Sequence, residues 1–352
     1  MVFHDLTEAV DGTVLGPGDL APGRLPRPRG TLSAFLVSAL AGDVRAVDGP
    51  PVADDDALFG EDGALSLYCL YELHYRGFAG VADGWEWEPS LLALRRRLEQ
   101  DLLARLDSLV APAWPTAADV HRPEGVAGEL RRLVGGGGGP SLSAHLAEHG
   151  SLDEFREFAV HRSLLQLKEA DPHTWAIPRV AGEAKAALVT IQADEYGQGR
   201  QHAMHQNLFG LTLRALGLDP AYGVYLDWVP ATTLATVNLP SLFGLHREHR
   251  AALLGHLAVF EMTSVGPMRA YSAALRRHGL PPAAREFFDV HVVADAEHEL
   301  IAADTLAAGL VRAEPGLGAG LLFGARAAMA VEAEASKAVM NAWAGGKSAL
   351  LP

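Results

Sequence analysis

Cysteine is almost absent from this chain. Cys69 is the single one, so the sequence excludes an internal disulfide bond and any metal site built from several thiolates. We expect Cys69 to be a small buried apolar residue. No apolar run reaches the roughly 18 residues that a membrane-spanning helix needs, and Met1–Asp5 lack the start of a secretion signal. These features predict a cytoplasmic protein with no membrane partner.

Positive charge is also scarce. The chain has 29 Lys and Arg residues against 43 Asp and Glu residues, which gives a formal net charge of −14. Its basic residues are spread out, apart from short clusters such as Arg95–Arg97. A polyanion would be repelled by such a surface, so we expect no nucleic-acid partner.

Few runs of β-branched residues occur, and no convincing strand-like alternation is visible, whereas Ala and Leu are abundant. This composition predicts an all-α protein. In the first part of the chain, a helical pattern covers 31–41. Asp54–Asp56 can cap a second helix that continues through 65–71, and a third is expected over Pro89–Val110 because proline suits a first helical turn.

Five consecutive glycines, Gly135–Gly139, are followed by Pro140. Regular structure does not survive such a stretch, so it predicts a linker and a domain boundary. We therefore expect a helical N-terminal region over 1–140, with an accessory or dimerisation role, and a second domain over 141–352.

The second domain reads as a set of longer helices. Ser151 and Glu154 form a capping-box pattern, and the helix that they begin runs towards Glu169 and must end before Pro172. The other predicted helices cover 183–216, 247–278 with a kink at Gly266–Pro267, and 283–311.

Polar residues interrupt an apolar seam on the helix predicted over 183–216. Steps of three and four residues place seven side chains on one face: Leu188, Ile191, Glu195, Gln198, His202, His205 and Phe209. Both ends of the seam are apolar, so it should face a core. A buried, ionised carboxylate costs several kcal/mol unless it is compensated. Something must therefore compensate Glu195.

The helix predicted over 283–311 has the same feature. His291, Asp295 and His298 stand at positions i, i+4 and i+7, and they therefore project from one face. Apolar residues such as Val293 and Leu300 surround them, so we expect this helix to be largely buried. Imidazole and carboxylate are ligands for iron, manganese or zinc. The alternatives are a solvated polar stripe and a hydrogen-bonded triad in the core.

Two further carboxylates are expected to point inward. Glu261 follows an apolar stretch, and Glu169 lies one turn after Leu165 on the face that also carries Phe158. Alone, Glu261 could form a salt bridge between helices and Glu169 could lie at a frayed helix end. Together with Glu195 and Asp295 they carry four negative charges, which two divalent ions would neutralise, with three imidazoles completing the coordination. The chain has no Glu-x-x-His motif, so the arrangement is not ferritin-like.

These residues resemble those of a known family. The similarity is carried by short motifs in order, namely Lys168–His173, Ala193–Gly199, Met204–His205, Gly255–Leu257 leading to Glu261–Ser264, and His291-x3-Asp295-x2-His298. The sequence resembles the haem-oxygenase-like diiron oxidase/oxygenase superfamily, and more narrowly its bacterial iron-containing redox enzymes, over about residues 150–312. Tyr71–Phe78 also resembles that branch.

The resemblance implies a haem-oxygenase-like helical bundle without haem, which holds two Fe(II)/Fe(III) ions and uses O₂ as co-substrate. The residues that it implies as iron ligands are Glu169, Glu195, His205, Glu261, His291, Asp295 and His298. Among members, the histidine that pairs with Glu195 follows it by seven or by ten residues. Met204–His205 fits the closer branch, which favours His205 over His202. Asp194, Tyr196 and Glu299 are candidates for hydrogen bonds to the ligand histidines.

The expected function is that of an O₂-dependent oxidoreductase acting on a small molecule. An amine or an amino-acid-derived substrate is favoured, with N-oxygenation or C–C or C–N cleavage as the outcome, and the acidic balance of the chain would attract such cations. We also expect an external electron donor and a homodimer. Two alternatives remain at this point: a metal-free, thiaminase-type enzyme that would use Cys69, and a non-catalytic helical binding protein.

Overall fold

The computed structural model describes residues 14–111, 120–136 and 141–352, and these ranges contain helices and no strand. The prediction of an all-α protein is therefore confirmed. Residues Met1–Asp5 and the centre of the predicted linker, 137–140, lie outside the described residues. The domain boundary at residue 140 stays a prediction.

The helices follow one another with short connections. Their bounds are α1 Thr31–Leu40, α2 Glu61–Glu72, α3 Pro89–Val110, α4 Pro123–Gly135, α5 Leu142–Glu148, α6 Leu152–Gln166, α7 Asp171–Thr174, α8 Gly182–Glu195, α9 His205–Ala215, α10 Ala231–Leu245, α11 Arg250–Arg277, α12 Glu286–Leu300, α13 Ala308–Ala313 and α14 Gly318–Ala344. A π-helical segment, Ile301–Ala307, joins α12 to α13. The predicted helix Pro89–Val110 and the capping box of Ser151 and Glu154 are confirmed.

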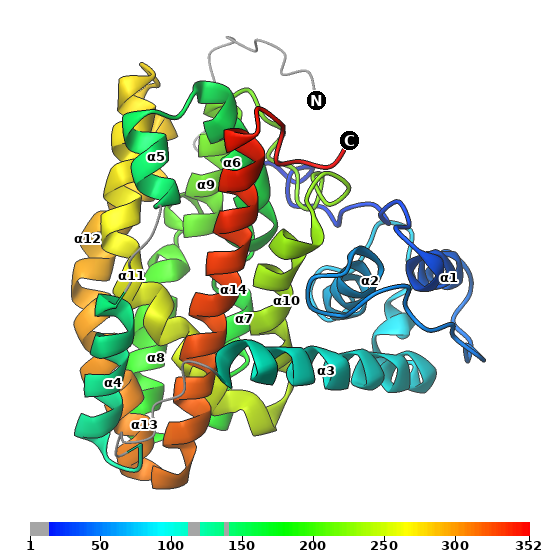
Figure 1. The fold of residues 1–352 in the computed structure, drawn as a ribbon, viewed down its shortest axis with the longest axis horizontal. Helices are drawn as coiled ribbons and strands as arrows, with labels where there is room; N and C mark the ends of the chain where they lie inside the picture. Colours follow the sequence, from blue (N-terminus) through cyan, green and yellow to red (C-terminus); the bar gives the residue numbers. More distant parts are fainter. Residues whose placement is uncertain (1–13, 112–119, 137–140) are drawn as a thin grey trace.

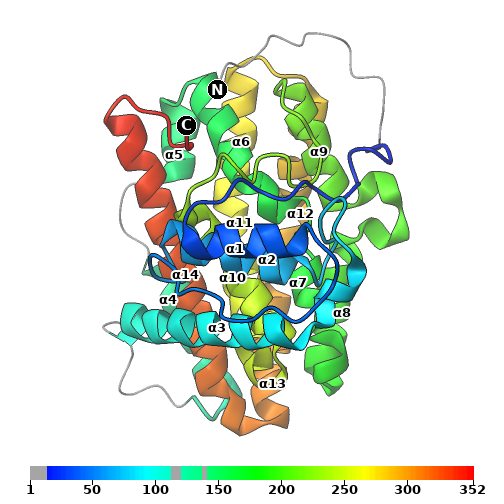
Figure 2. The same ribbon diagram turned by 90° about the vertical axis from the view of Figure 1, so that its right-hand side faces the viewer.

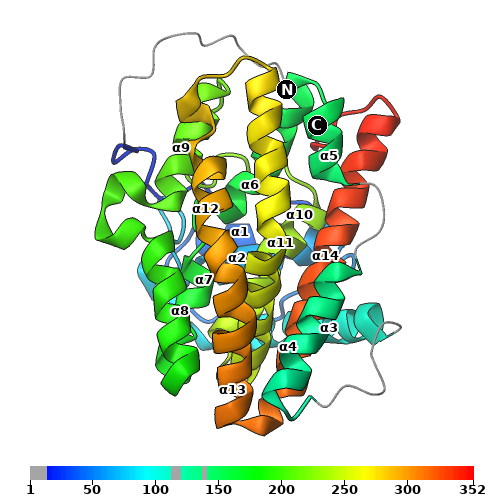
Figure 3. The same cartoon turned by 90° about the vertical axis from the view of Figure 1, so that its left-hand side faces the viewer.

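The long helices form an upright bundle in which α11 packs against both α12 and α14 (Figures 1 and 3). Glycine permits the close approach of α11 and α14. A Cβ added to Gly255 would collide with the carbonyl oxygen of Leu321, and one added to Gly324 would collide with that of Ala252. The backbones therefore touch where any larger residue would hold them apart, and this contact supports the part of α11 that leads to Glu261.

The N-terminal helices lie across one side of the bundle, where α2 packs on α10 and α3 on α14 (Figure 2). A buried ion pair connects this layer to the bundle: Lys168 Nζ donates to Glu72 at 2.7 Å, and the Tyr222 hydroxyl donates to the same carboxylate at 2.7 Å. The ammonium also lies 4.2 Å from the centre of the Tyr75 ring. Such a buried pair needs several partners to offset its loss of water. It fixes the residue next to Glu169.

The predicted continuous helix over 183–216 is wrong. α8 ends at Glu195, and α9 begins at His205. Between them Gly197, Gln198 and Gly199 adopt φ values of 60°, 53° and 75°. A right-handed helix cannot continue through successive left-handed residues, so the chain turns and starts again.

The expectation that the helix over 283–311 is largely buried is also wrong for its outer face. Val293 and Leu300 are 76% and 60% exposed, whereas His291, Asp295 and His298 on the opposite face are buried. α12 is therefore buried along one stripe. Elsewhere, α11 continues through Gly266 and Pro267.

Across the described ranges no single helix has the length and apolar character to cross a membrane. One bent pair, Glu286–Ala313 with Pro315–Ala344, meets that test jointly, with an angle of 117° between its halves.

The close contact of α11 and α14 predicts that alanine substitutions at two glycines of α14 will change the free energy of unfolding by different amounts. Gly324→Ala should lower the free energy of unfolding by about 1–3 kcal/mol, the usual cost of overpacking. Gly320→Ala is the matched control, since its added Cβ would lie 3.5 Å from the Ala251 Cβ, an ordinary contact, and it should stay within about 0.5 kcal/mol of wild type. Denaturant unfolding followed by circular dichroism measures both. Equal losses would contradict the proposed role of the contact.

Candidate metal centre

Five segments bring the seven sequence-predicted residues together. Glu169 lies in the turn between α6 and α7, Glu195 is the last residue of α8, and His205 is the first residue of α9. α11 supplies Glu261, and one face of α12 supplies the other three. All seven are buried: Glu169, Glu195, His205, Glu261, His291, Asp295 and His298. The break after α8 is what places Glu195 beside His205, because a helix end and a helix start meet there.

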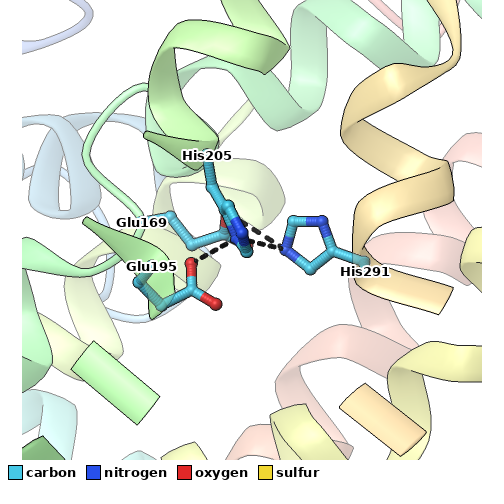
Figure 4. A group of neighbouring side chains, drawn as sticks. All are labelled: Glu169, Glu195, His205 and His291. Atoms are coloured by element: carbon cyan, nitrogen blue, oxygen red, sulfur yellow. Dashed lines mark hydrogen bonds and ion pairs between the residues drawn. The ribbon is translucent and has the colours of Figure 1, made fainter. Parts of the chain in front are cut away.

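Four of these residues form the first half of the cluster (Figure 4). His205 Nδ1 lies 2.8 Å from Glu195 Oε2 and 3.1 Å from His291 Nε2. His291 Nε2 lies 3.7 Å from Glu169 Oε2. One ligand atom from each of the four residues lies within 4.8 Å of the others. Two imidazole nitrogens and two carboxylate oxygens therefore surround one point.

The hydrogen bond at the far side of the His291 ring defines its tautomer. Nδ1 lies 2.7 Å from the carbonyl oxygen of Phe287, one turn earlier on α12. A carbonyl only accepts, so Nδ1 carries the proton and donates. In the neutral ring, Nε2 then presents a lone pair to the cluster. This is the orientation that metal-binding histidines adopt.

The second half of the cluster is built around His298. Its Nδ1 lies 3.1 Å from Glu261 Oε2 and 3.7 Å from Asp295 Oδ1. Glu195, Glu261 and His298 again offer three ligand atoms within 4.8 Å of one another. Glu195 is thus common to both halves, where it can bridge two cations. Asp295 lines the cavity beside them.

The carboxylates have unmet bonding capacity. Both side-chain oxygens of Glu169 and both of Asp295 are buried without a hydrogen-bond partner among the described residues. A buried polar atom in this state is costly. A cavity of about 10 Å³ lies between Glu169, Glu195, Glu261, His291 and Asp295. Carboxylate oxygens without partners, imidazole lone pairs and a cavity of this size are what bound metal ions require. The residues present therefore suit the iron ions that the resemblance implies.

Electrostatics supports this fit. Burial, together with the charges of Glu195 and Asp295, raises the pKa of Glu169 well above its usual range. Burial likewise raises the pKa of Glu261 to about 7. These carboxylates resist ionisation together because they share a dry interior. A bound cation would relieve the repulsion.

Two of the three histidines, His205 and His298, have raised pKa values because carboxylates surround them, whereas burial lowers the pKa of His291. Burial alone would lower the pKa of His298, but its contacts with Asp295 and Glu261 outweigh burial and raise it to about 11. For Glu195, burial alone would raise the pKa, and the neighbouring His205 outweighs it and lowers the value to about 2. Protonated imidazole therefore balances the carboxylates in the absence of metal, and a metal ion would take over that positive charge.

One of the predicted supporting residues does contact a cluster histidine. Asp194 Oδ2 lies 2.9 Å from His298 Nε2, so it can hold the ring from its outer side. Tyr196 instead donates to Asp171 at 2.8 Å, and the Glu299 side chain is exposed. His202, the alternative to His205, is also exposed.

Sequence reasoning gave no role to two residues that line the cavity. His173 Nε2 lies 3.1 Å from His256 Nδ1, and both rings are buried. Gln192 donates to the carbonyl oxygen of Ala170 at 2.8 Å and so ties α8 to the turn that carries Glu169. The position of Gln192 one turn before Glu195 is the one signal that could have indicated it.

The geometry of the turn between α8 and α9 predicts that alanine substitutions at its two glycines will affect metal affinity differently. Both have positive φ, so alanine at either should cost roughly 1–2 kcal/mol. Only at position 197 would the new Cβ also meet the backbone of Ala203 and Met204, which leads into His205. Gly197→Ala should therefore lower Co²⁺ affinity by at least about tenfold, and Gly199→Ala should have a much smaller effect. A visible-absorption titration measures both; equal affinities in the two variants would be evidence against the turn's role.

Comparison with known proteins agrees with the geometry. Residues 156–333, about half of the chain, match the family model described as iron-containing redox enzyme. A search of the curated proteins found no match. The matched segment contains all seven cluster residues, and it confirms the resemblance and the haem-oxygenase-like class of the fold. The chain belongs to the iron-containing redox enzyme family of the haem-oxygenase-like superfamily.

Proposed function

We propose that this protein is a non-haem diiron oxidase or oxygenase that uses O₂ to oxidise a small molecule. The observation that carries the proposal is the pair of buried histidine–carboxylate groups that share Glu195. One iron would be held by Glu169, Glu195, His205 and His291, and the other by Glu195, Glu261 and His298, with Asp295 beside them. Iron in such a site supplies the electrons for O₂ reduction that protein side chains lack.

The residues around the centre have distinct tasks in this proposal. Asp194 and the Phe287 carbonyl orient His298 and His291 through their outer nitrogens. Leu257 and Phe260 line the cavity next to the carboxylates and keep bulk water away. A dry, fixed site strengthens each charge interaction at the reacting centre.

The favoured substrate is an amine or a compound derived from an amino acid, oxidised at nitrogen or cleaved at a C–C or C–N bond. The excess of acidic residues supports a substrate that carries an ammonium group. An external electron donor, a homodimer and a cytoplasmic location stay predictions.

Two alternatives have less support. A thiaminase-type mechanism needs a nucleophilic thiolate, but Cys69 is fully buried in α2, and burial raises the pKa of its thiol far above the usual range. A non-catalytic binding protein would have no use for four buried carboxylates, which cost stability when no cation is bound.

Anaerobic Fe(II) loading followed by mixing with O₂ tests the proposal. We expect about two irons per chain, as carboxylate-bridged centres hold, and O₂ consumption that depends on the bound iron. Metal analysis and an oxygen electrode give the two readings. A chain that folds but binds no iron, or binds iron without consuming O₂, would overturn the proposal.

Three variants test whether Glu195 is shared by both halves of the cluster. Glu195→Gln should abolish stoichiometric binding of both irons, since it removes the one carboxylate common to both groups. Glu299→Gln removes an exposed carboxylate next to His298 and should bind iron as wild type does. Asp194→Asn should lie between them, with affinity lowered roughly 10–100-fold, as for a residue that orients a ligand. Retention of both irons by Glu195→Gln would disprove the bridging role.

A further inference from the structure

A second, much larger cavity adjoins the candidate metal centre. Its volume is about 650 Å³, and α6, α11 and α14 contribute most of its wall. Phe260 and Ser264 line both this cavity and the small one among the carboxylates. These two residues flank Glu261 on α11. A molecule in the large cavity would therefore lie next to the metal centre, whose own cavity of about 10 Å³ has no room for a substrate.

The wall of the large cavity is mostly apolar. Its large side chains include Phe158, Met268, Tyr271, Met329 and Met340. Three hydroxyl groups in the wall add little polarity, because they donate to backbone carbonyls of their own helices: Thr236 to Thr233, Thr263 to Val259 and Ser264 to Glu261. Methionines adapt to different shapes. This wall suits the apolar body of a ligand.

One ion pair faces this apolar space. Arg162 on α6 donates through Nη1 to both carboxylate oxygens of Glu332 on α14, at 3.0 Å each. Among the described residues its contacts use Nη1 alone, so Nη2 and Nε remain for another acceptor. The two side chains keep 22% and 35% of their surface accessible, and both line the cavity. Each partner can thus bind a further group of opposite charge.

Charge balance selects the ligand. The ion pair is neutral, so an added single charge in this apolar space would stay uncompensated and would be costly. A ligand with one carboxylate and one ammonium group adds no net charge. Its carboxylate would take the free edge of the Arg162 guanidinium, in the geometry that arginine prefers, and its ammonium would take Glu332.

We infer that the large cavity binds a zwitterionic substrate with a sizeable apolar body, an amino acid with a long or aromatic side chain, and that Arg162 and Glu332 recognise its head. This inference rests on the proposed function only in calling the ligand a substrate. Binding of the ligand in the cavity does not depend on turnover. Lys337 belongs to the lining and is exposed, so the ligand would enter the cavity on that side.

Three probes that share one alkyl chain test the inference: α-aminodecanoic acid, decanoic acid and decylamine, each below the concentration at which it forms micelles. Calorimetry on the full-length chain, iron-free and after anaerobic iron loading, measures binding. We expect α-aminodecanoic acid to bind at least about tenfold more tightly than either single-charge analogue, since each analogue lacks one charged hydrogen bond.

Variants identify the residues responsible. Glu332→Gln should remove the preference for α-aminodecanoic acid over decanoic acid, and Glu286→Gln, which neutralises an exposed carboxylate of α12 outside the lining, should retain it. Arg162→Gln should weaken both carboxylate-bearing probes and spare decylamine, a pattern that a general loss of folding would not produce.

The outcomes separate the inference from the proposed function. Equal binding of the three probes to wild type, or an unchanged preference in Glu332→Gln, overturns the inference even if the protein loads iron. A probe preference that depends on Glu332 supports the inference even if iron loading fails, in which case the proposed function alone is contradicted.

Discussion

The mutual repulsion of four buried carboxylates is the constraint on which this structure depends. Glu169, Glu195, Glu261 and Asp295 come from four different segments and converge at one cavity. Burial and the neighbouring charges raise the pKa of Glu169 and of Glu261, so these two carboxylates resist ionisation beside Glu195, whose pKa the adjacent His205 lowers. Two divalent cations would reverse this balance. Folding around such a centre would therefore couple the packing of the bundle to metal binding.

The fold meets this constraint through helix ends and outer hydrogen bonds. A straight helix would carry Glu195 and His205 about 15 Å apart, given its rise of roughly 1.5 Å per residue. The left-handed turn at Gly197–Gly199 brings them within 2.8 Å instead. The rings are then oriented from outside the cluster, His291 by a backbone carbonyl and His298 by Asp194. Positions that look irregular in the fold are thus those that shape the site.

Local periodicity predicted some of this site and failed at other parts. His291, Asp295 and His298 share a face because helical spacing alone decides it, and that prediction needed no knowledge of neighbouring helices. The seam drawn from Leu188 to Phe209 assumed one helix, which would also have buried Gln198 and His202; both are exposed. His205 was favoured by family resemblance, not by spacing. Helices α10 and α14 were not predicted, since Pro240 in the one and glycines such as Gly324 in the other weaken the helical pattern of the sequence. Their stability comes from packing with distant segments, which a sequence pattern does not record.

The two cavities would have different tasks: the small one would hold the metal ions, and the large one would bind the substrate. The small cavity among the carboxylates has the size of an ion, so a substrate of the proposed reaction would approach from the large apolar cavity, which shares Phe260 and Ser264 with it. Glu261 lies between these two residues on α11, so one turn of a single helix faces both spaces. That helix is held against α14 by backbone contacts at Gly255 and Gly324, and α14 also carries Glu332. A ligand bound to the Arg162–Glu332 pair would thus contact α14, the helix that packs against the α11 segment carrying Glu261. Changes in the large cavity would then alter ligand choice without touching the buried carboxylates.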